Sequence, residues 1–248
     1  MRVSPGSNTL STQSNRVSRV FIALLTLAVI SAAVFWIAAA TPYFRAHRES
    51  FGRYPEIFWD RRYGVWVHIF GGTLALFVGP VQLWLGQTRQ KLRLHRALGK
   101  VYLLGIAIGC VGAYYLCLTT PVGLGTPFGW IYATGLFGMA SAWTATTAMA
   151  ILAIRYRNFA QHREWMIRSY VVTLSFVFFR TIAAGLEAFG VGGGGLPGAT
   201  ARATLAAWLL WAIPLLVTEL FLQWPKLQQE SLQSSSARIT DFGAHPRL

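Results

Sequence analysis

The dipeptide His-Arg occurs twice in this sequence, each time just ahead of a long apolar run. The segment LHRALGKVY contains His95 and Arg96, and the segment QHREWMIRSY contains His162 and Arg163. An imidazole nitrogen can bind a metal ion or form a hydrogen bond, and an adjacent guanidinium can hold an anionic group. Because the chain has only 5 histidines, we take the repeated pair as the first indication of a functional site.

Other ionisable residues fall inside the apolar runs, where a charge is costly. Arg180 lies near the middle of its run, and a central arginine costs about 2.5 to 3.5 kcal/mol on insertion scales. We therefore expect Arg180 to point into the bundle and reach Glu187, a backbone carbonyl or a polar cavity. His68 lies about one turn inside another run, either as a neutral imidazole bonded to a neighbour or as a functional group. Glu219 is the remaining acid at membrane depth.

The composition places these residues in a membrane protein. Apolar residues make up 54% and charged residues 12% of the 248 positions, which is too apolar for a soluble domain. The net charge of +14 is concentrated in short gaps between the apolar runs, as topology signals are. We therefore expect the lipid bilayer as the partner and exclude nucleic acid.

The apolar runs predict the fold class. Six of them are long enough to cross a hydrocarbon core of about 30 Å, which indicates an all-α membrane protein with six transmembrane helices and a four-helix core. The runs are residues 19–40, 64–86, 98–118, 128–154, 165–189 and 204–224. They divide the chain into an N-terminal tail (1–18), a transmembrane domain (19–226) and a polar, disordered C-terminal tail (227–248).

The basic residues predict the orientation. The second and fourth gaps are rich in arginine and lysine, whereas the third gap, TTPVGLGTP, has neither. The positive-inside rule then places both termini and both His-Arg pairs on the cytoplasmic side of the inner membrane. The first gap opposes this assignment, because it would be external and yet contains Arg45, Arg48, Arg53, Arg61 and Arg62.

The spacing of the two pairs predicts two helical hairpins, each with a basic turn that contains His-Arg. Small residues at intervals of four, such as Gly105, Gly109 and Ala113 or Gly138 and Ala142, predict close helix packing in lipid. Pro80 should bend its helix and free a carbonyl that Gln82 or a neighbour must satisfy.

Three segments carry a resemblance to a known family. They are HIFGGTLALFVGPVQLW, LHRALGKVY and HREWMIRSYVVTLSFVFFR, which together span roughly residues 64 to 185. With these segments the chain resembles the bacterial membrane proteins catalogued as domain of unknown function 2306. The resemblance implies a multi-pass membrane protein and brings no established activity.

The arrangement is also loosely similar to the cytochrome b561-like and ferric-reductase-like bundles, in which histidines on four central helices hold haem. This similarity implies haem b as a cofactor, with His95 and His162 as the iron ligands. The run 128–154 contains no histidine, so at most one haem with two histidine ligands fits. The further residues of the candidate cofactor or polar site are His68, Arg96, Arg163 and Arg180.

Three functions remain open at this point. The first is a haem-binding electron-transfer component with a redox partner. The second is a small-molecule or proton-coupled transporter whose polar path contains His68, Arg180, Glu187 and Glu219, with a hinge at Pro80. The third is a structural role in membrane assembly, in which His95 and His162 only bind lipid phosphate or a nearby loop. No motif in the sequence identifies an enzymatic reaction.

Overall fold

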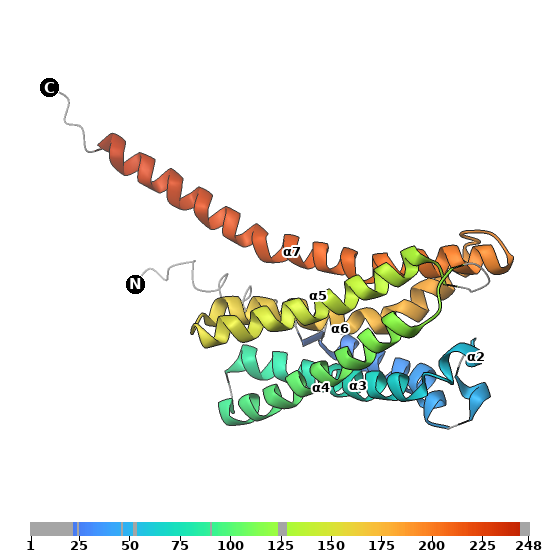
Figure 1. The fold of residues 1–248 in the computed structure, drawn as a ribbon. Helices are drawn as coiled ribbons and strands as arrows, with labels where there is room; N and C mark the ends of the chain where they lie inside the picture. Colours follow the sequence, from blue (N-terminus) through green and yellow to red (C-terminus); the bar gives the residue numbers. More distant parts are fainter. Residues whose placement is uncertain are drawn as a thin grey trace.

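A computed structural model describes residues 22–23, 25–45, 47–51, 54–89, 91–123 and 128–243, apart from the side chains at positions 180, 181, 183, 184, 196 and 230–243. Within these residues the fold is helical and contains no strand (Figure 1). The first helix, Leu25–Arg45, ends in the π-helical segment η1 (Trp36–Ala40) and the 3-10 segment η2 (Thr41–Arg45). The remaining elements are η3 (Arg48–Ser50), α2 (Pro55–Phe58), α3 (Arg62–Thr88), α4 (Leu92–Thr119), α5 (Trp130–Arg155), α6 (Phe159–Ala188) and α7 (Gly195–Gly243).

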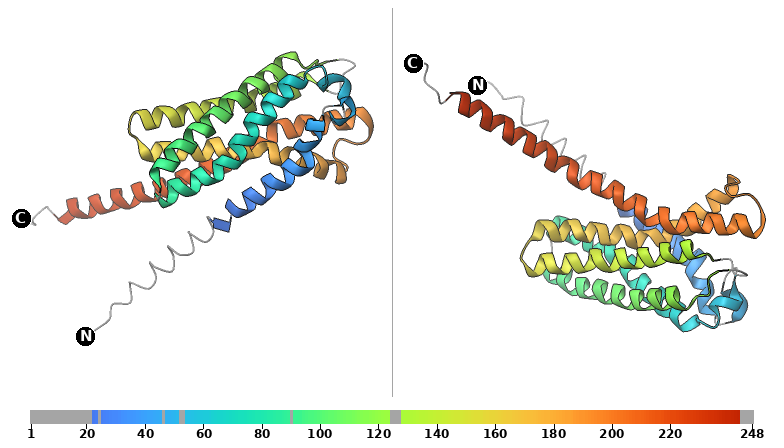
Figure 2. Two further views of the ribbon diagram at one scale, coloured as in Figure 1. Left: turned by 90° about the horizontal axis from the view of Figure 1, so that it is seen from below. Right: turned by 45° about the horizontal axis from the view of Figure 1, so that its top comes forward.

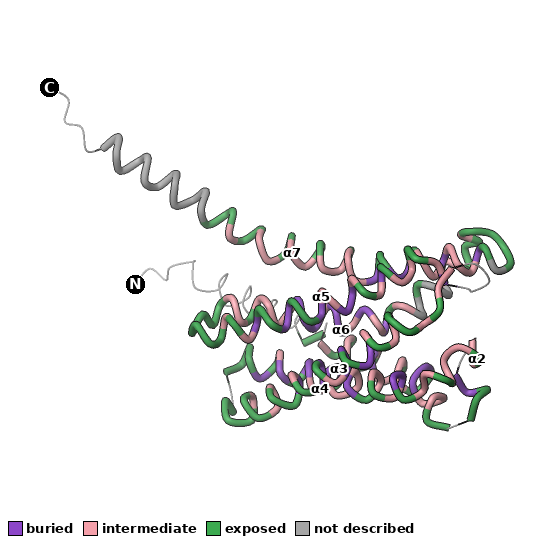
Figure 3. The backbone as a smooth tube through the Cα atoms, viewed as in Figure 1, coloured by how far each residue is buried: buried purple, intermediate pink, exposed green. Residues whose placement is uncertain are grey.

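The predicted class of helical membrane protein is confirmed. Among the described residues, 5 helices are long and apolar enough to cross a membrane: Leu25–Arg45, α3, α4, α5 and the segment Pro197–Gln229 of α7. The predicted run 165–189 corresponds to α6, which is 30 residues long. α6 is not among these 5 helices, and some of its side chains lie outside the described residues. Buried positions follow the inside of the helices, and their outer faces are exposed (Figure 3). Large apolar side chains such as Val111, Leu216 and Phe221 lie on those exposed faces, as a surface in contact with lipid requires.

The helices form the two predicted hairpins. α3 packs along α4, and α5 packs along α6 (Figure 2). Three residues join each pair, and Arg89, Lys91 and Arg157 adopt left-handed backbone conformations there, with φ of 53°, 48° and 57°. Both connections lie at one end of the bundle, which we call the turn end. α7 packs on α5 and α6, and the first helix lies against α3 and α6.

Glycines bring α3 and α4 into backbone contact. A Cβ atom added at Gly71 would collide with backbone atoms of Gly105 and Gly109, and one added at Gly112 would meet the backbone of His68. The predicted ridge of small residues therefore faces α3. This contact brings the imidazole of His68 within reach of the α4 backbone.

A neighbouring helix packs against α3 where the predicted bend at Pro80 would lie. A proline at this position cannot donate to the carbonyl of Leu76, four residues earlier. The hydroxyl of Tyr170 on α6 donates to that carbonyl at 3.2 Å, and its ring occupies the space next to Gly79. Gln82, the other predicted partner, instead donates its Nε2 amide to the carbonyl of His95 at 2.9 Å.

The end of the bundle opposite the turn end, which we call the loop end, has a folded cap. Phe51 is fully buried there, with ring centroids 5.3 Å from Tyr43 and 5.2 Å from Trp59 in edge-to-face geometry. Arg61 caps the C-terminus of α4, because its Nε donates to the carbonyl of Thr119 at 2.8 Å. At least one arginine of the first gap thus satisfies a helix terminus.

The prediction of a disordered C-terminal tail is wrong as far as Gly243. α7 continues to that residue and leaves the bundle at the turn end (Figure 1). The physical reason is composition, because residues 226–242 contain neither glycine nor proline and include several good helix formers. Residues 1–18 and 244–248 lie outside the described residues.

Candidate functional site

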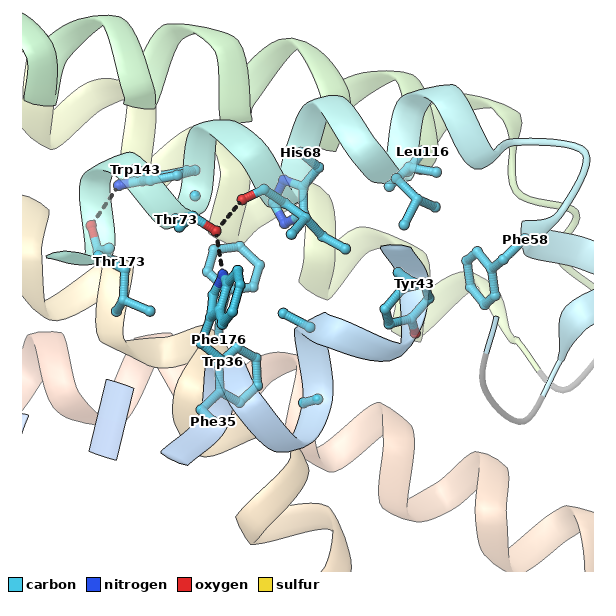
Figure 4. Close-up of a pocket in the computed structure, with 16 residues that line it drawn as sticks. Phe35, Trp36, Tyr43, Phe58, His68, Thr73, Leu116, Trp143, Thr173 and Phe176 are labelled. Atoms are coloured by element: carbon cyan, nitrogen blue, oxygen red, sulfur yellow. Dashed lines mark hydrogen bonds between the residues drawn. The ribbon is translucent and has the colours of Figure 1, made fainter. Parts of the chain in front are cut away.

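A cavity of about 230 Å³ lies between the first helix and helices α3 to α6 (Figure 4). Its wall combines Trp36 from the first helix, His68 and Thr73 from α3, Trp143 from α5 and Phe176 from α6. These elements are far apart in sequence, so the cavity exists only in the packed bundle. Most of its wall is apolar, with a few polar groups, which is the usual make-up of a small-molecule site.

His68 is the histidine of this cavity. Its Nδ1 lies 2.9 Å from the carbonyl oxygen of Gly109, and its ring meets Phe176 edge-on at 4.9 Å between centroids. Because a carbonyl can only accept, Nδ1 carries the proton and Nε2 keeps its lone pair. No described residue forms a hydrogen bond with Nε2. The structure thus holds His68 by its Nδ1 and leaves its second nitrogen free.

A second cavity of about 110 Å³ lies beside the first. The two cavities share the wall formed by Phe58, His68, Leu116 and Phe176. The second is lined further by α4 and α5, including Cys117 and Met139. His68 and Phe176 therefore belong to both spaces, and a change of the Phe176 rotamer would alter both.

A buried chain of hydroxyl groups lies next to the first cavity. The hydroxyl of Tyr102 on α4 is 3.0 Å from that of Ser169 on α6, which in turn is 2.8 Å from the hydroxyl of Thr147 on α5. Trp143 donates its indole N–H to Thr173 at 2.9 Å. These bonds tie three helices together, as buried polar groups in lipid must be satisfied within the protein. The sequence analysis did not single out Tyr102 or Thr147, although the run of hydroxyl residues in TATT was a usable signal.

The two histidines of the His-Arg pairs lie in the first turns of α4 and α6, at the turn end. Nδ1 of His162 donates to the carbonyl of Ala150 at 2.9 Å. Nδ1 of His95 is buried and has no hydrogen-bond partner among the described residues. His95 is the fourth residue of α4 and His162 the fourth residue of α6. The fold therefore brings the pair to one end of one bundle.

The predicted arginines of the site differ in how far they can be placed. Arg96 and Arg163 are exposed at the turn end, each next to its histidine. Arg180 lies within α6, but its side chain is outside the described residues. The expected contact between Arg180 and Glu187 is therefore untested, whereas Glu187 lies 3.4 Å from Arg202 of α7. Arg202 also donates to the carbonyl of Gly193 at 2.9 Å.

A buried cation that the sequence analysis missed is Arg168, which is only 6% exposed. Its Nε donates to Glu219 at 2.8 Å, and its Nη1 is 3.6 Å from Glu164. Lys226 donates to Glu164 at 2.8 Å, and the Arg168 guanidinium lies 4.6 Å above the ring of Trp165. This cluster joins α6 to α7, and the spacing of four between Glu164 and Arg168 was the available signal.

The acids proposed for a transport path are not part of the cavity. Glu219 belongs to the Arg168 cluster near the start of α6, and Glu187 lies near the end of α6. Neither lines the two cavities beside His68. Among the described residues, no three or more His, Cys, Asp or Glu side chains come together as a metal-binding group.

Fold and site together define a helical, multi-pass membrane protein with polar groups inside the bundle. A family model described as "Predicted membrane protein (DUF2306)" matches residues 65–222, more than half of the chain. The chain therefore belongs to this family, and the match contains both hairpins and most of α7. No curated protein and no solved structure matches the chain.

Proposed function

We propose that this protein is an electron-transfer component that binds one b-type haem between His95 and His162. The observation that carries the proposal is the buried Nδ1 of His95, which has no partner in the described part of the chain. Buried polar atoms without a partner are rare and call for an explanation. An imidazole that turns toward a bound cofactor would supply one.

The state of His162 supports the same site. Its Nδ1 is committed to the carbonyl of Ala150, so the lone pair on Nε2 is available. Histidines that bind metals typically donate their other N–H to a carbonyl or carboxylate in this way. The donor set of two imidazoles is the one that suits a haem, whose porphyrin provides the remaining ligands.

The surroundings fit an anionic cofactor. Arg96 and Arg163 follow the two histidines directly and lie exposed at the same end, where they would hold the haem propionates by charge and hydrogen bonds. When bound, the haem would supply a one-electron centre. The residues of this chain would fix its orientation and set its electrostatic environment, and a redox partner would meet it at the turn end.

The proposal includes a topology. We infer six membrane crossings, because α6 runs back alongside α5 and its 30 residues measure about 45 Å at the usual rise per residue. Helices α3 to α6 would form the core around the haem. Both termini and the turn end would face the cytoplasm, with the protein in the inner membrane, as the basic turns indicate.

The test is the colour of the purified protein. Protein from haem-replete cells should show a haem absorption band that changes on reduction, and His95→Ala and His162→Ala should each abolish it. His47 lies outside the bundle core, so His47→Ala should leave the band intact. A colourless preparation, or equal loss from all three substitutions, would contradict the proposal and favour a structural role for the two histidines.

A further inference from the structure

The cavity beside His68 restricts the class of molecule that it can bind. Many aromatic rings line its wall, namely those of Phe35, Trp36, Tyr43, Phe58, Trp143 and Phe176. Such walls favour a flat ring that stacks or packs edge-on. The volume of about 230 Å³ is below the range of about 300 to 1,000 Å³ that is usual for drug-sized ligands. The space therefore suits a single ring system.

The hydrogen-bond donors of Trp36, Thr73, Trp143 and Thr173 around the cavity are already used. Thr73 donates to the carbonyl of Ile69 at 2.7 Å, and the indole of Trp36 donates to Thr73 at 2.9 Å. Thr173 donates to the carbonyl of Ser169 at 3.0 Å, while it accepts from Trp143. These groups offer no spare N–H or O–H to a ligand.

His68 contributes a hydrogen-bond acceptor to the cavity. Its Nδ1–H is held by the carbonyl of Gly109, and the glycines that bring α3 and α4 together fix this arrangement. Nε2, on the other side of the ring, has no partner among the described residues and is an acceptor. A ligand in this cavity would therefore gain most from a hydroxyl group that donates to Nε2, because an unmatched polar atom at this depth is costly.

We propose that the cavity binds a membrane-soluble molecule with a flat hydroxylated ring, of the phenol or quinol class, whose hydroxyl donates to Nε2 of His68. A molecule that carries only acceptors, such as the corresponding quinone or an ether, would place an acceptor against an acceptor. The cavity is not fully enclosed, so an alkyl tail on the ring can extend out of it. This site is separate from the haem proposal and does not depend on it.

The test compares two probes of the same ring and tail, in one of which methyl groups replace the hydroxyl hydrogens. The protein is reconstituted in phosphatidylcholine nanodiscs, and radiolabelled decylhydroquinone or its dimethyl ether is titrated under anaerobic, reducing conditions. Binding to empty nanodiscs is subtracted. We expect saturable binding of one hydroquinone per protein and roughly 10-fold weaker binding of the ether, the ratio expected for one lost hydrogen bond.

A matched variant connects this difference to His68. His68→Phe keeps a ring of similar size against Phe176 and should reduce the affinity for hydroquinone to that for the ether, while His47→Ala should leave both unchanged. Equal binding of the two probes to the unmodified protein would overturn the proposal and point to an apolar chain as the occupant. Absence of saturable binding, or unchanged discrimination in a folded His68→Phe protein, would also overturn it. If the variant fails to fold, the two probes on the unmodified protein still decide.

Discussion

The α3–α4 and α5–α6 turns share the His-Arg pair, a three-residue connection and left-handed residues, yet they hold their histidines differently. In the first turn, the backbone carbonyl of His95 accepts from Gln82 at 2.9 Å, and the ring nitrogen Nδ1 is buried without a partner. In the second turn, the ring of His162 is itself fixed, through Nδ1, to Ala150 at 2.9 Å. The same motif thus gives one imidazole whose Nδ1 is fixed by a carbonyl and one whose Nδ1 has no partner among the described residues.

The difference continues along the helices. α3 and α4 meet through the backbone at Gly71 and Gly109, whereas α5 and α6 are joined by side-chain hydroxyls, including Thr147 and Ser169 at 2.8 Å. The helices of the first hairpin therefore pack closely because glycines lie at their contact. The helices of the second hairpin are joined by hydrogen bonds between side chains. Equal patterns in the sequence do not imply equal interfaces.

The largest expected effect is at the glycine contact. Gly71→Ala places a methyl group against the α4 backbone, which cannot move aside as a side chain can, and should lower the free energy of unfolding by about 3 kcal/mol. Gly138→Ala is the matched control, because its Cβ would lie 3.0 Å from the ring of Trp211, and should cost less than about 1 kcal/mol. Denaturant unfolding in detergent, followed by circular dichroism, measures both. Similar losses from the two variants would show that backbone contact is not what distinguishes the first hairpin.

An intermediate effect should separate the two histidines in protein prepared without haem. His162→Ala removes a hydrogen bond and should lower the free energy of unfolding by about 1 kcal/mol. His95→Ala removes a buried atom that has no partner, so its cost should be smaller or of opposite sign. The same unfolding assay measures both variants. A greater loss from His95→Ala would mean that its ring already has a partner in the haem-free protein.

The smallest effect concerns the helix starts after the two turns. The side chain of Asn158 accepts from the backbone N–H of Gln161 at 3.0 Å, whereas Lys91 makes no such bond at the start of α4. Asn158→Ala should therefore cost about 0.5 kcal/mol, and Lys91→Gln should be close to neutral. Thermal melting of the two variants side by side measures the difference, and equal shifts would remove this distinction between the turns.

The sequence was sufficient for the features that depend on local patterns. Runs of apolar residues predicted the helices, the spacing of the two His-Arg pairs predicted the two hairpins, and the spacing of Gly105 and Gly109 predicted a close helix contact. The hydrogen-bond partners of several buried polar groups lie far away in the sequence, so local patterns could not predict them. Arg168 meets Glu219, 51 positions away, and Tyr170 meets Leu76, 94 positions away.

For the candidate site, the sequence singled out residues but did not indicate their hydrogen-bonding states. It singled out His68, His95 and His162, yet the direction of each ring follows from which carbonyl lies next to it. Gly109 and Ala150 provide those carbonyls for His68 and His162, and nothing in the residue types identifies them in advance. The aromatic wall of the cavity also combines helices that the sequence does not pair.

The contact between Tyr170 and α3 beside Pro80 bears on how the protein can move. For α3 to change its shape at Pro80, the carbonyl of Leu76 would have to leave the Tyr170 hydroxyl in surroundings where no water replaces it. The ring beside Gly79 would also have to vacate its space. Tyr170 therefore stabilises the conformation of α3 beside Pro80 and opposes a hinge motion there. Such stiffness would be unfavourable for a cycle that opens the protein alternately to each side, and it would suit the electron-transfer role that we propose.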